Sequence, residues 1–197
     1  MLEDLSSGEV NNGSELTKFI KHAKNDYIAW SKPETGRVKL NTDGSSLGNP
    51  GVAGAGDVIR DSHGNLLLAF SKSIGHGTSN YAELRALVEG IKHCKNLNFS
   101  AVDVEMDSKV VLAWLDNKRC GSWYLEDYWE ELLFQSINMD LRFMHIHREG
   151  NGAADWLAKR GATDGDGVWQ SMGDVSPLFR GLLRVDKWGL PSVRRKR

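Results

Sequence analysis

Four acidic residues, far apart in the sequence, have the types and settings that metal-dependent phosphate chemistry uses. They are Asp43 in KLNTDGSSLGNPG, Glu83 in TSNYAELRA, Asp107 in VEMDSK and Asp155 in EGNGAADWLA. If the fold brings them together, like charges share one pocket and stay ionised only with divalent cations between them. Carboxylate oxygens suit Mg²⁺ or Mn²⁺ and argue against zinc. The order Asp, Glu, Asp, Asp therefore predicts a metal site.

Two of these acids end predicted β-strands. In residues 37–43 apolar and polar side chains alternate, which is typical of a strand with two different faces, and Asp43 closes the polar face. Residues 101–107 alternate in the same way and end at Asp107. If these strands are parallel neighbours, both aspartates meet at the edge where mixed α/β sheets usually bind ligands.

The other two acids belong to predicted helices. Apolar residues recur at helical spacing over 80–95, which places Glu83 in the first turn. A final helix over 153–162 carries Asp155, and Asn151 lies four residues before it on the same helix face. Both acids can therefore turn toward the edge of the sheet that carries the two aspartates.

The complete order of predicted elements is βββαβααβα, which indicates a mixed sheet with an antiparallel meander and helical crossovers to parallel strands. The predicted strands cover residues 37–43, 52–60, 66–74, 101–107 and 141–147, and the predicted helices cover residues 80–95, 109–117, 125–136 and 153–162. Residues 44–51 (GSSLGNPG) are predicted to form a turn. A short helix with Leu16, Phe19, Ile20 and Ala23 on one face is also expected.

Each acid also has an ordinary structural explanation. Asp43-Gly44 is a common turn dipeptide, and Asp107-Ser108 can cap a helix. Acids in a first helical turn interact favourably with the helix dipole, which covers Glu83 and Asp155. Taken together these explanations are weaker, because four separate elements would have to place an acid at one edge by accident.

The motifs TDGSSLGNPG, NYAELRA, MDSK and EGNGAAD together resemble the ribonuclease H family. The pattern is similar to plant-type ribonuclease H-like domains related to non-LTR retroelement reverse transcriptases, and it covers roughly residues 36–162. The tail SPLFRGLLRVDKWG is similar to the ending of that group. The resemblance implies a five-stranded mixed sheet of strand order 3-2-1-4-5 with flanking helices.

The resemblance also implies hydrolysis of the RNA strand of RNA–DNA hybrids with two Mg²⁺ or Mn²⁺ ions per site. Asp43 would bridge both ions, Asp155 would help to hold the ion that activates water, and Glu83 and Asp107 would hold the ion at the leaving oxygen. Two cations about 4 Å apart stabilise both oxygens of an in-line displacement. Glu83 also resembles the family residue near the RNA 2′-hydroxyl, the group that distinguishes RNA from DNA.

Further residues match family positions that contact the hybrid. Asn49, Ser79 and Asn80 resemble groups at the minor groove, and Thr78 resembles a threonine that binds phosphate on the DNA strand. The full set of expected substrate-binding residues is Gly44, Ser45, Asn49, Thr78, Ser79, Asn80, Lys109 and Asn151. His147 is a candidate auxiliary residue in place of a loop histidine of the family.

Length and composition indicate one domain with extensions. The resemblance implies a ribonuclease H-like domain over 36–165, which leaves an N-terminal extension over 1–35 and a basic tail over 166–197. Residues 37–165 hold seventeen acids and fourteen bases, whereas residues 166–197 hold three acids and seven bases. The two cysteines form no paired or metal-binding framework. With no signal-like segment and no apolar run of about 18 residues, we expect an intracellular protein, in the nucleus, cytoplasm or an organelle, without a membrane partner.

A second hypothesis is a catalytically silent module, derived from a retroelement ribonuclease H domain, that binds nucleic acid or protein. Longer bacterial family members carry a basic, tryptophan-containing protrusion, whereas residues 116–128 (DNKRCGSWYLEDY) are short and nearly neutral. Lys109 also stands where many members have glutamine. Loss of hybrid cleavage with retained binding would favour the silent module.

Overall fold

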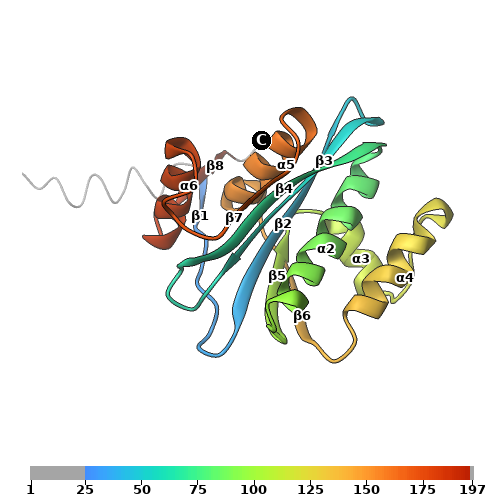
Figure 1. The fold of residues 1–197 in the computed structure, drawn as a ribbon, viewed down its shortest axis with the longest axis horizontal. Coiled ribbons are helices and arrows are strands. Elements are labelled where there is room, and N and C mark those ends of the chain that lie inside the picture. The colour runs from blue at the N-terminus through green and yellow to red at the C-terminus, as the bar shows by residue number, and fades with distance from the viewer. Residues whose placement is uncertain (1–24, 196–197) are drawn as a thin grey trace, which may run out of the picture.

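The computed structural model describes residues 25–195 and contains one central mixed sheet covered by helices on both faces (Figure 1). Its strand order is β6-β5-β2-β3-β4-β7, with β5 and β6 parallel to β2 and the other pairs antiparallel. The strands are β2 (Val38–Leu47), β3 (Gly51–Arg60), β4 (Leu66–Gly77), β5 (Ala101–Met106), β6 (Asp140–His145) and β7 (Gly167–Trp169).

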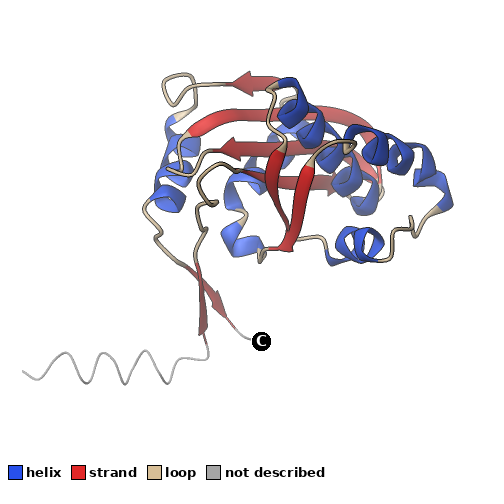
Figure 2. Cartoon of the chain, turned by 90° about the horizontal axis from the view of Figure 1, so that it is seen from below, coloured by secondary structure: helices blue, strands red, loops and turns tan. Residues whose placement is uncertain are grey.

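The predicted sheet order is confirmed. If the five predicted strands are numbered along the chain, β4-β3-β2-β5-β6 is the order 3-2-1-4-5. The structure adds β7 as a sixth strand, paired with β4 through Ala69 and Trp169. It also contains a separate two-stranded ribbon of β1 (Asn25–Ile28) and β8 (Ser192–Arg195), which extends from the rest of the fold in Figure 2.

The helices divide between the two faces of the sheet. On one face, α2 packs against β2 and β3, and α3 and α4 lie beyond it; on the other face, α5 packs against β2, β3 and β4, with α6 beside it. The helices are α2 (Ser79–Asn96), α3 (Lys109–Asp116), α4 (Glu126–Gln135), α5 (Gly152–Thr163) and α6 (Pro177–Lys187), with short 3₁₀ turns η1 (Trp123–Leu125) and η2 (Arg148–Gly150).

Alternation along the strands builds a separate apolar core on each face. On the α2 face, Leu40 and Val104 pack with Leu87 and Ile91, which lie four residues apart on one side of the helix. On the α5 face, Val58 packs with other buried side chains: Ala153, Leu157, Phe179 and Leu183. Burial of apolar area on both faces holds the sheet rigidly between the helices.

Strand β2 is longer than predicted. The expected turn over 44–51 is reduced to Gly48–Pro50, and the backbone of residues 44–47 continues to pair with β3 as far as Leu47 and Val52. Glycine and serine favour turns locally, but antiparallel pairing with a long neighbouring strand outweighs that preference. Asp43 therefore lies inside a strand rather than at its end.

The C-terminal segment differs from the expected basic tail, because much of it is folded onto the domain. Residues 167–169 form β7, and α6 buries Phe179 and Leu183 against α5. Charge counting missed this because α6 carries its bases on one side and its apolar residues on the other. The predicted helix around residues 16–23 lies outside the described residues. Within residues 25–195, no helix combines the length and apolarity that crossing a membrane requires.

Candidate active site

The two aspartates meet where the parallel pairing of β2 and β5 ends. That pairing runs from Val38–Val102 to Asn41–Glu105. Asp43 lies two residues beyond it on β2, and Asp107 directly follows the last residue of β5. The carboxyl ends of two parallel neighbours therefore place both side chains at one edge, as the sequence predicted.

Glu83 reaches the same edge because α2 lies unusually close to β2. A Cβ on Gly44 would stand 2.1 Å from the carbonyl carbon of Ala82 and 2.2 Å from the backbone nitrogen of Glu83. Only glycine permits this approach. Helix α2 begins at Ser79, so Glu83 lies in its second turn rather than in the first, which was the predicted position.

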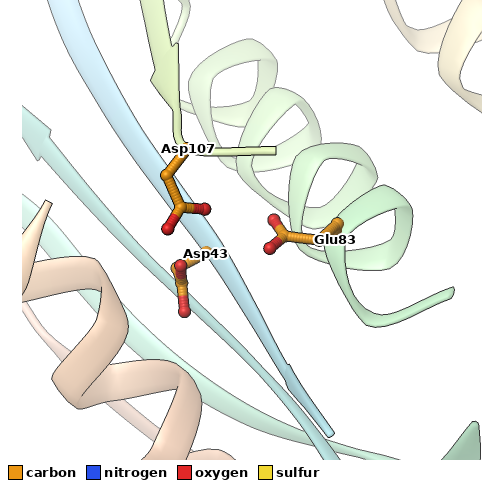
Figure 3. A group of neighbouring side chains, drawn as sticks. All are labelled: Asp43, Glu83 and Asp107. Carbon is orange, nitrogen blue, oxygen red and sulfur yellow. The ribbon is translucent and has the colours of Figure 1, made fainter. Parts of the chain in front are cut away.

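These three carboxylates form one cluster. One oxygen from each of Asp43, Glu83 and Asp107 lies within 4.8 Å of the other two. Figure 3 shows the three side chains pointing toward one another from β2, α2 and the end of β5. Asp43 is buried, whereas the other two are partly exposed toward the open side of the cluster. This spacing allows all three oxygens to bind a shared hard cation.

Burial and mutual repulsion disfavour ionisation of the cluster, and the nearby charge of Arg148 offsets this only in part. Burial raises the pKa of Asp43 well above its usual value, and the charges of Asp107 and Asp155 raise it further. Burial also raises the pKa of Glu83 strongly, with added repulsion from Asp43 and Asp107, and it raises the pKa of Asp107. A divalent cation would reverse this repulsion, so the donor set fits Mg²⁺ or Mn²⁺.

Asp155 lies in the first turn of α5, as predicted, but it is not in the group of three. One of its oxygens accepts hydrogen bonds from Arg148 at 2.7 and 3.2 Å, and the other accepts one from Lys159 at 2.5 Å. It nevertheless lies close enough for its charge to raise the pKa of Asp43 and Asp107. Both oxygens of Asp155 are therefore engaged by these two bases.

Arg148 is a candidate functional residue that the sequence reasoning missed. It lies in η2, seven residues before Asp155, and its side chain is 66% exposed despite that ion pair. Its charge also acts on Asp43 and Asp107. The motif HIHREGN contains this arginine directly after His147, but a single arginine between predicted elements does not by itself indicate a function. An exposed guanidinium beside a carboxylate cluster is well suited to contact a phosphate group.

Four of the expected substrate-binding residues gather at the start of α2. Thr78 is the N-cap: its hydroxyl accepts from the backbone N–H of Tyr81 at 3.2 Å. The side-chain oxygen of Asn49, in the turn between β2 and β3, accepts from the backbone N–H of Ser79 at 2.8 Å. Ser79 and Asn80 are the first two residues of the helix that carries Glu83.

The other expected contact residues occupy varied settings. Gly44 and Ser45 belong to β2 and are half-buried, and Lys109 is exposed at the start of α3. Asn151 is buried at the start of α5, where its side chain donates to the backbone oxygen of Thr42 at 2.9 Å. It is therefore placed to hold the backbone beside Asp43 rather than to meet a ligand.

His147 lies just outside β6 and before η2, not inside the predicted strand over 141–147. A guanidinium nitrogen of Arg194, in β8, lies 2.7 and 3.0 Å from its two ring nitrogens. His145, the last residue of β6, packs edge-on against it with ring centres 5.1 Å apart. The auxiliary role predicted for His147 stays a prediction.

A mixed sheet of this strand order, with acidic residues converging where the parallel pairing of its first and fourth core strands ends, defines the ribonuclease H-like class of proteins. Comparison with known families agrees. Residues 41–161 match the family described as reverse transcriptase-like, and the chain belongs to that family.

Individual relatives and solved structures place the chain in the same class. It is 33% identical over 190 residues to the Arabidopsis thaliana protein named "Putative ribonuclease H protein At1g65750", and 28% identical over 148 residues to ribonuclease HI of Halobacterium salinarum. The crystal structure of ribonuclease H1 from Halobacterium salinarum aligns with a TM-score of 0.61 and 28% identity, over 65% of this chain and 98% of that one. LC11-RNase H1, solved in complex with an RNA/DNA hybrid, aligns with a TM-score of 0.60 and 30% identity, over 64% and 97%.

The matches cover different shares of the relatives' own length. The Arabidopsis match covers 95% of this chain but 30% of that protein, and the match to the mycobacterial bifunctional protein Rv2228c covers 66% of this chain and 39% of that protein. The Halobacterium ribonuclease HI match covers 71% of each. The chain thus corresponds to one part of the larger relatives.

Proposed function

We propose that this chain is a metal-dependent endonuclease that hydrolyses the RNA strand of RNA–DNA hybrids by a two-metal mechanism. The observation that carries the proposal is the convergence of Asp43, Glu83 and Asp107 within 4.8 Å at one edge of the sheet. Relatives named ribonuclease H, and the LC11 enzyme solved with a hybrid, support the same substrate class.

The four carboxylates would hold Mg²⁺ or Mn²⁺ ions at two positions. Asp43, central and buried, would contact both ions; Glu83 and Asp107 would complete one position, and Asp155 would complete the other. When bound, two such ions polarise the scissile phosphate and favour an attacking hydroxide over water. Arg148 and Lys159 hold Asp155 in the absence of cations and would neutralise charge on the phosphate when Asp155 turns to the metal.

The start of α2 provides the proposed hybrid-binding surface. Asn49 fixes the turn after β2 to the first residue of α2, so Ser79 and Asn80 are held one turn from Glu83. The hydroxyl of Thr78 is also within 3.2 Å of the Tyr124 hydroxyl, and Trp123 beside it is 86% exposed. The domain is slightly acidic, so net charge would not hold a nucleic acid here. These polar and aromatic groups would instead contact it through hydrogen bonds and stacking.

The test is incubation of the full chain with a hybrid labelled on either strand, with and without Mg²⁺ or Mn²⁺. The proposal predicts metal-dependent cleavage of the RNA strand alone and a loss of at least about a hundredfold in rate in Asp43→Asn. Asp116→Asn, which makes the same change at an exposed site on α3, should cleave like the wild type. Hybrid binding without metal-dependent cleavage would instead support the catalytically silent module.

A further inference from the structure

The polar face of β2 continues away from the carboxylates into a buried hydrogen-bond network. Its centre is Asn41, two residues before Asp43 and 1% exposed. Around this side chain lie buried or partly buried groups from five other segments of the chain. They are Trp30, Arg60, Glu105, Asn151 and, through Arg60, Asp186.

Asn41 makes four hydrogen bonds through its side-chain amide. Its oxygen accepts from the indole N–H of Trp30 at 2.8 Å and from the guanidinium of Arg60 at 2.7 Å. Its nitrogen donates to Glu105 at 3.0 Å and to the side-chain oxygen of Asn151 at 3.3 Å. This uses the hydrogen-bonding capacity of an amide fully, and a fully satisfied buried network fixes a single arrangement of its members.

Two of these bonds lead to elements that carry proposed metal ligands, and Asn41 itself lies on a third such element. Asn41 itself lies on the strand of Asp43, and Glu105 lies two residues before Asp107 on the adjacent strand. The backbone oxygen of Asn151 accepts from the backbone N–H of Asp155 at 3.0 Å, while its side chain donates to the backbone of β2 beside Asp43. The network therefore ties together the backbones that position three of the four carboxylates.

The other bonds lead out of the family-matched region of residues 41–161. Trp30 precedes it, and its ring lies against the Arg60 guanidinium at 3.7 Å from the ring centre. Asp186, in α6, follows it and pairs with Arg60 at 2.7 Å. The Arg60 side chain is only 1% exposed, so its charge depends on this pair and on the ring of Trp30.

We propose that Asn41 is a positioning residue for the metal site, held in place by Trp30 and by the Arg60–Asp186 pair from the flanking segments. This inference rests on the proposed function for its catalytic consequence, but its structural part does not. The flanking segments thereby set the relative position of β2 and the start of α5. Loss of their contacts loosens Asp155 relative to Asp43 without removing any proposed ligand.

The structural part is tested on the full chain without metal, by hydrogen exchange of the backbone amides of residues 151–156. Arg60→Met combined with Asp186→Leu removes both charges and the bond to Asn41, and an apolar replacement of a buried ion pair keeps the fold stable. Exchange in this segment should be about tenfold faster than in the wild type, as expected when about one net hydrogen bond of local stabilisation is lost. Trp30→Phe, a milder variant that keeps an aromatic side chain but removes the indole N–H bonded to Asn41, should also accelerate exchange.

The matched control is Lys187→Gln, which removes a 2.6 Å contact between α6 and Asn65 and leaves the network intact. It should exchange like the wild type. If the paired variant and Trp30→Phe both exchange at the control rate, the inference is overturned, whatever the protein does to a hybrid.

The catalytic part is tested by hybrid cleavage at varied Mg²⁺. The paired variant should have a lower kcat and need more Mg²⁺ for half-maximal rate, with KM for the hybrid unchanged, because the network lies away from the hybrid-binding residues. Faster exchange with unchanged kcat and Mg²⁺ dependence overturns the positioning role. A wild-type protein that does not cleave would contradict the proposed function, and the exchange experiment would still decide the structural part.

Discussion

Among individual residues, the three clustered carboxylates show most directly how burial and charge produce a site. Asp43 is buried, whereas Glu83 and Asp107 are partly exposed. Burial raises the pKa of Asp43 and Glu83, and the negative charges of neighbouring carboxylates raise it further. In the folded protein without cations, the pKa values of all three are raised. On the proposed function, such a cluster would exchange protons for a cation rather than stabilise the fold.

This exchange predicts a pH-dependent metal affinity. Cation binding lowers the raised pKa values of Asp43 and Glu83, so protons must leave as Mg²⁺ or Mn²⁺ binds. Affinity should therefore increase as pH rises above about 4, where ordinary carboxyls ionise, and calorimetry in buffers of different ionisation enthalpy should detect proton release on binding. Affinity that is constant across this range would show that the carboxyls are already ionised.

A second prediction concerns Asp57, on β3 opposite Thr42, which is fully buried. Neither of its carboxyl oxygens has a hydrogen-bond partner of acceptable geometry in the described part of the chain, and burial raises its pKa well above the usual value. Above about pH 4 the unfolded chain releases this proton and the folded chain keeps it, so stability falls by up to about 1.4 kcal/mol per pH unit.

Asp57→Asn removes that dependence. From about pH 4 to pH 7, the melting temperature of the variant should rise relative to that of the wild type, because only the wild type loses stability as pH rises through the ionisation of Asp57 in the unfolded chain. Differential scanning calorimetry across this range, with exposed Asp116→Asn as the control, measures the difference. A difference that does not change with pH would contradict the raised pKa of Asp57.

Among the secondary-structure elements, the contact between β2 and α2 sets the distance between Asp43 and Glu83. The sequence predicted both elements, since apolar alternation and helical spacing are local signals. It did not predict that β2 continues past Gly44, because pairing with β3 and contact with α2 are tertiary effects. Gly44, in a sequence that is typical of a turn, instead lies in β2 at the point where the strand comes closest to α2.

Gly44→Ala tests this contact. The added methyl would overlap the backbone of Ala82 and Glu83, so β2 and α2 must separate. We expect a loss of about 1–3 kcal/mol in the free energy of unfolding, the usual cost of overpacking, together with loss of hybrid cleavage. Denaturant titration measures the first effect.

The matched substitution is Gly181→Ala in α6, where an added Cβ meets no heavy atom within 4 Å. It should raise stability by about 0.5–1 kcal/mol, because alanine replaces glycine in a helix interior. If both substitutions change stability equally, the close approach of α2 to Gly44 has no energetic role.

Across the whole molecule, described residues on both sides of the matched family region contribute to the fold. Helix α6 completes the core on the α5 face, where Phe179 stacks on Trp156 with ring centres 5.0 Å apart. The sequence indicated a basic tail because net charge describes the segment as a whole, whereas burial depends on which side of the helix each residue occupies. The sequence also did not predict the roles of Asn41 and Arg60, because their hydrogen-bond partners come from segments that only the tertiary fold brings together.

Phe179→Ala measures the contribution of this helix. Truncation of a 1% exposed aromatic side chain should cost about 3–5 kcal/mol in the free energy of unfolding. Leu178→Ala, at a neighbouring position that is 66% exposed, should change it by no more than about 0.5 kcal/mol. Similar effects at the two positions would contradict the packing of α6.

The central claim, that the converging carboxylates hold the cations that cleave RNA in a hybrid, is tested most directly by one measurement. It is the single-turnover rate of RNA-strand cleavage as Mg²⁺ is titrated, compared between the wild type and Asp43→Asn. The rate should rise with Mg²⁺ to saturation in the wild type and be lower by at least about a hundredfold at every concentration in the variant. Equal rates in the two proteins, or a wild-type rate independent of Mg²⁺, would contradict it.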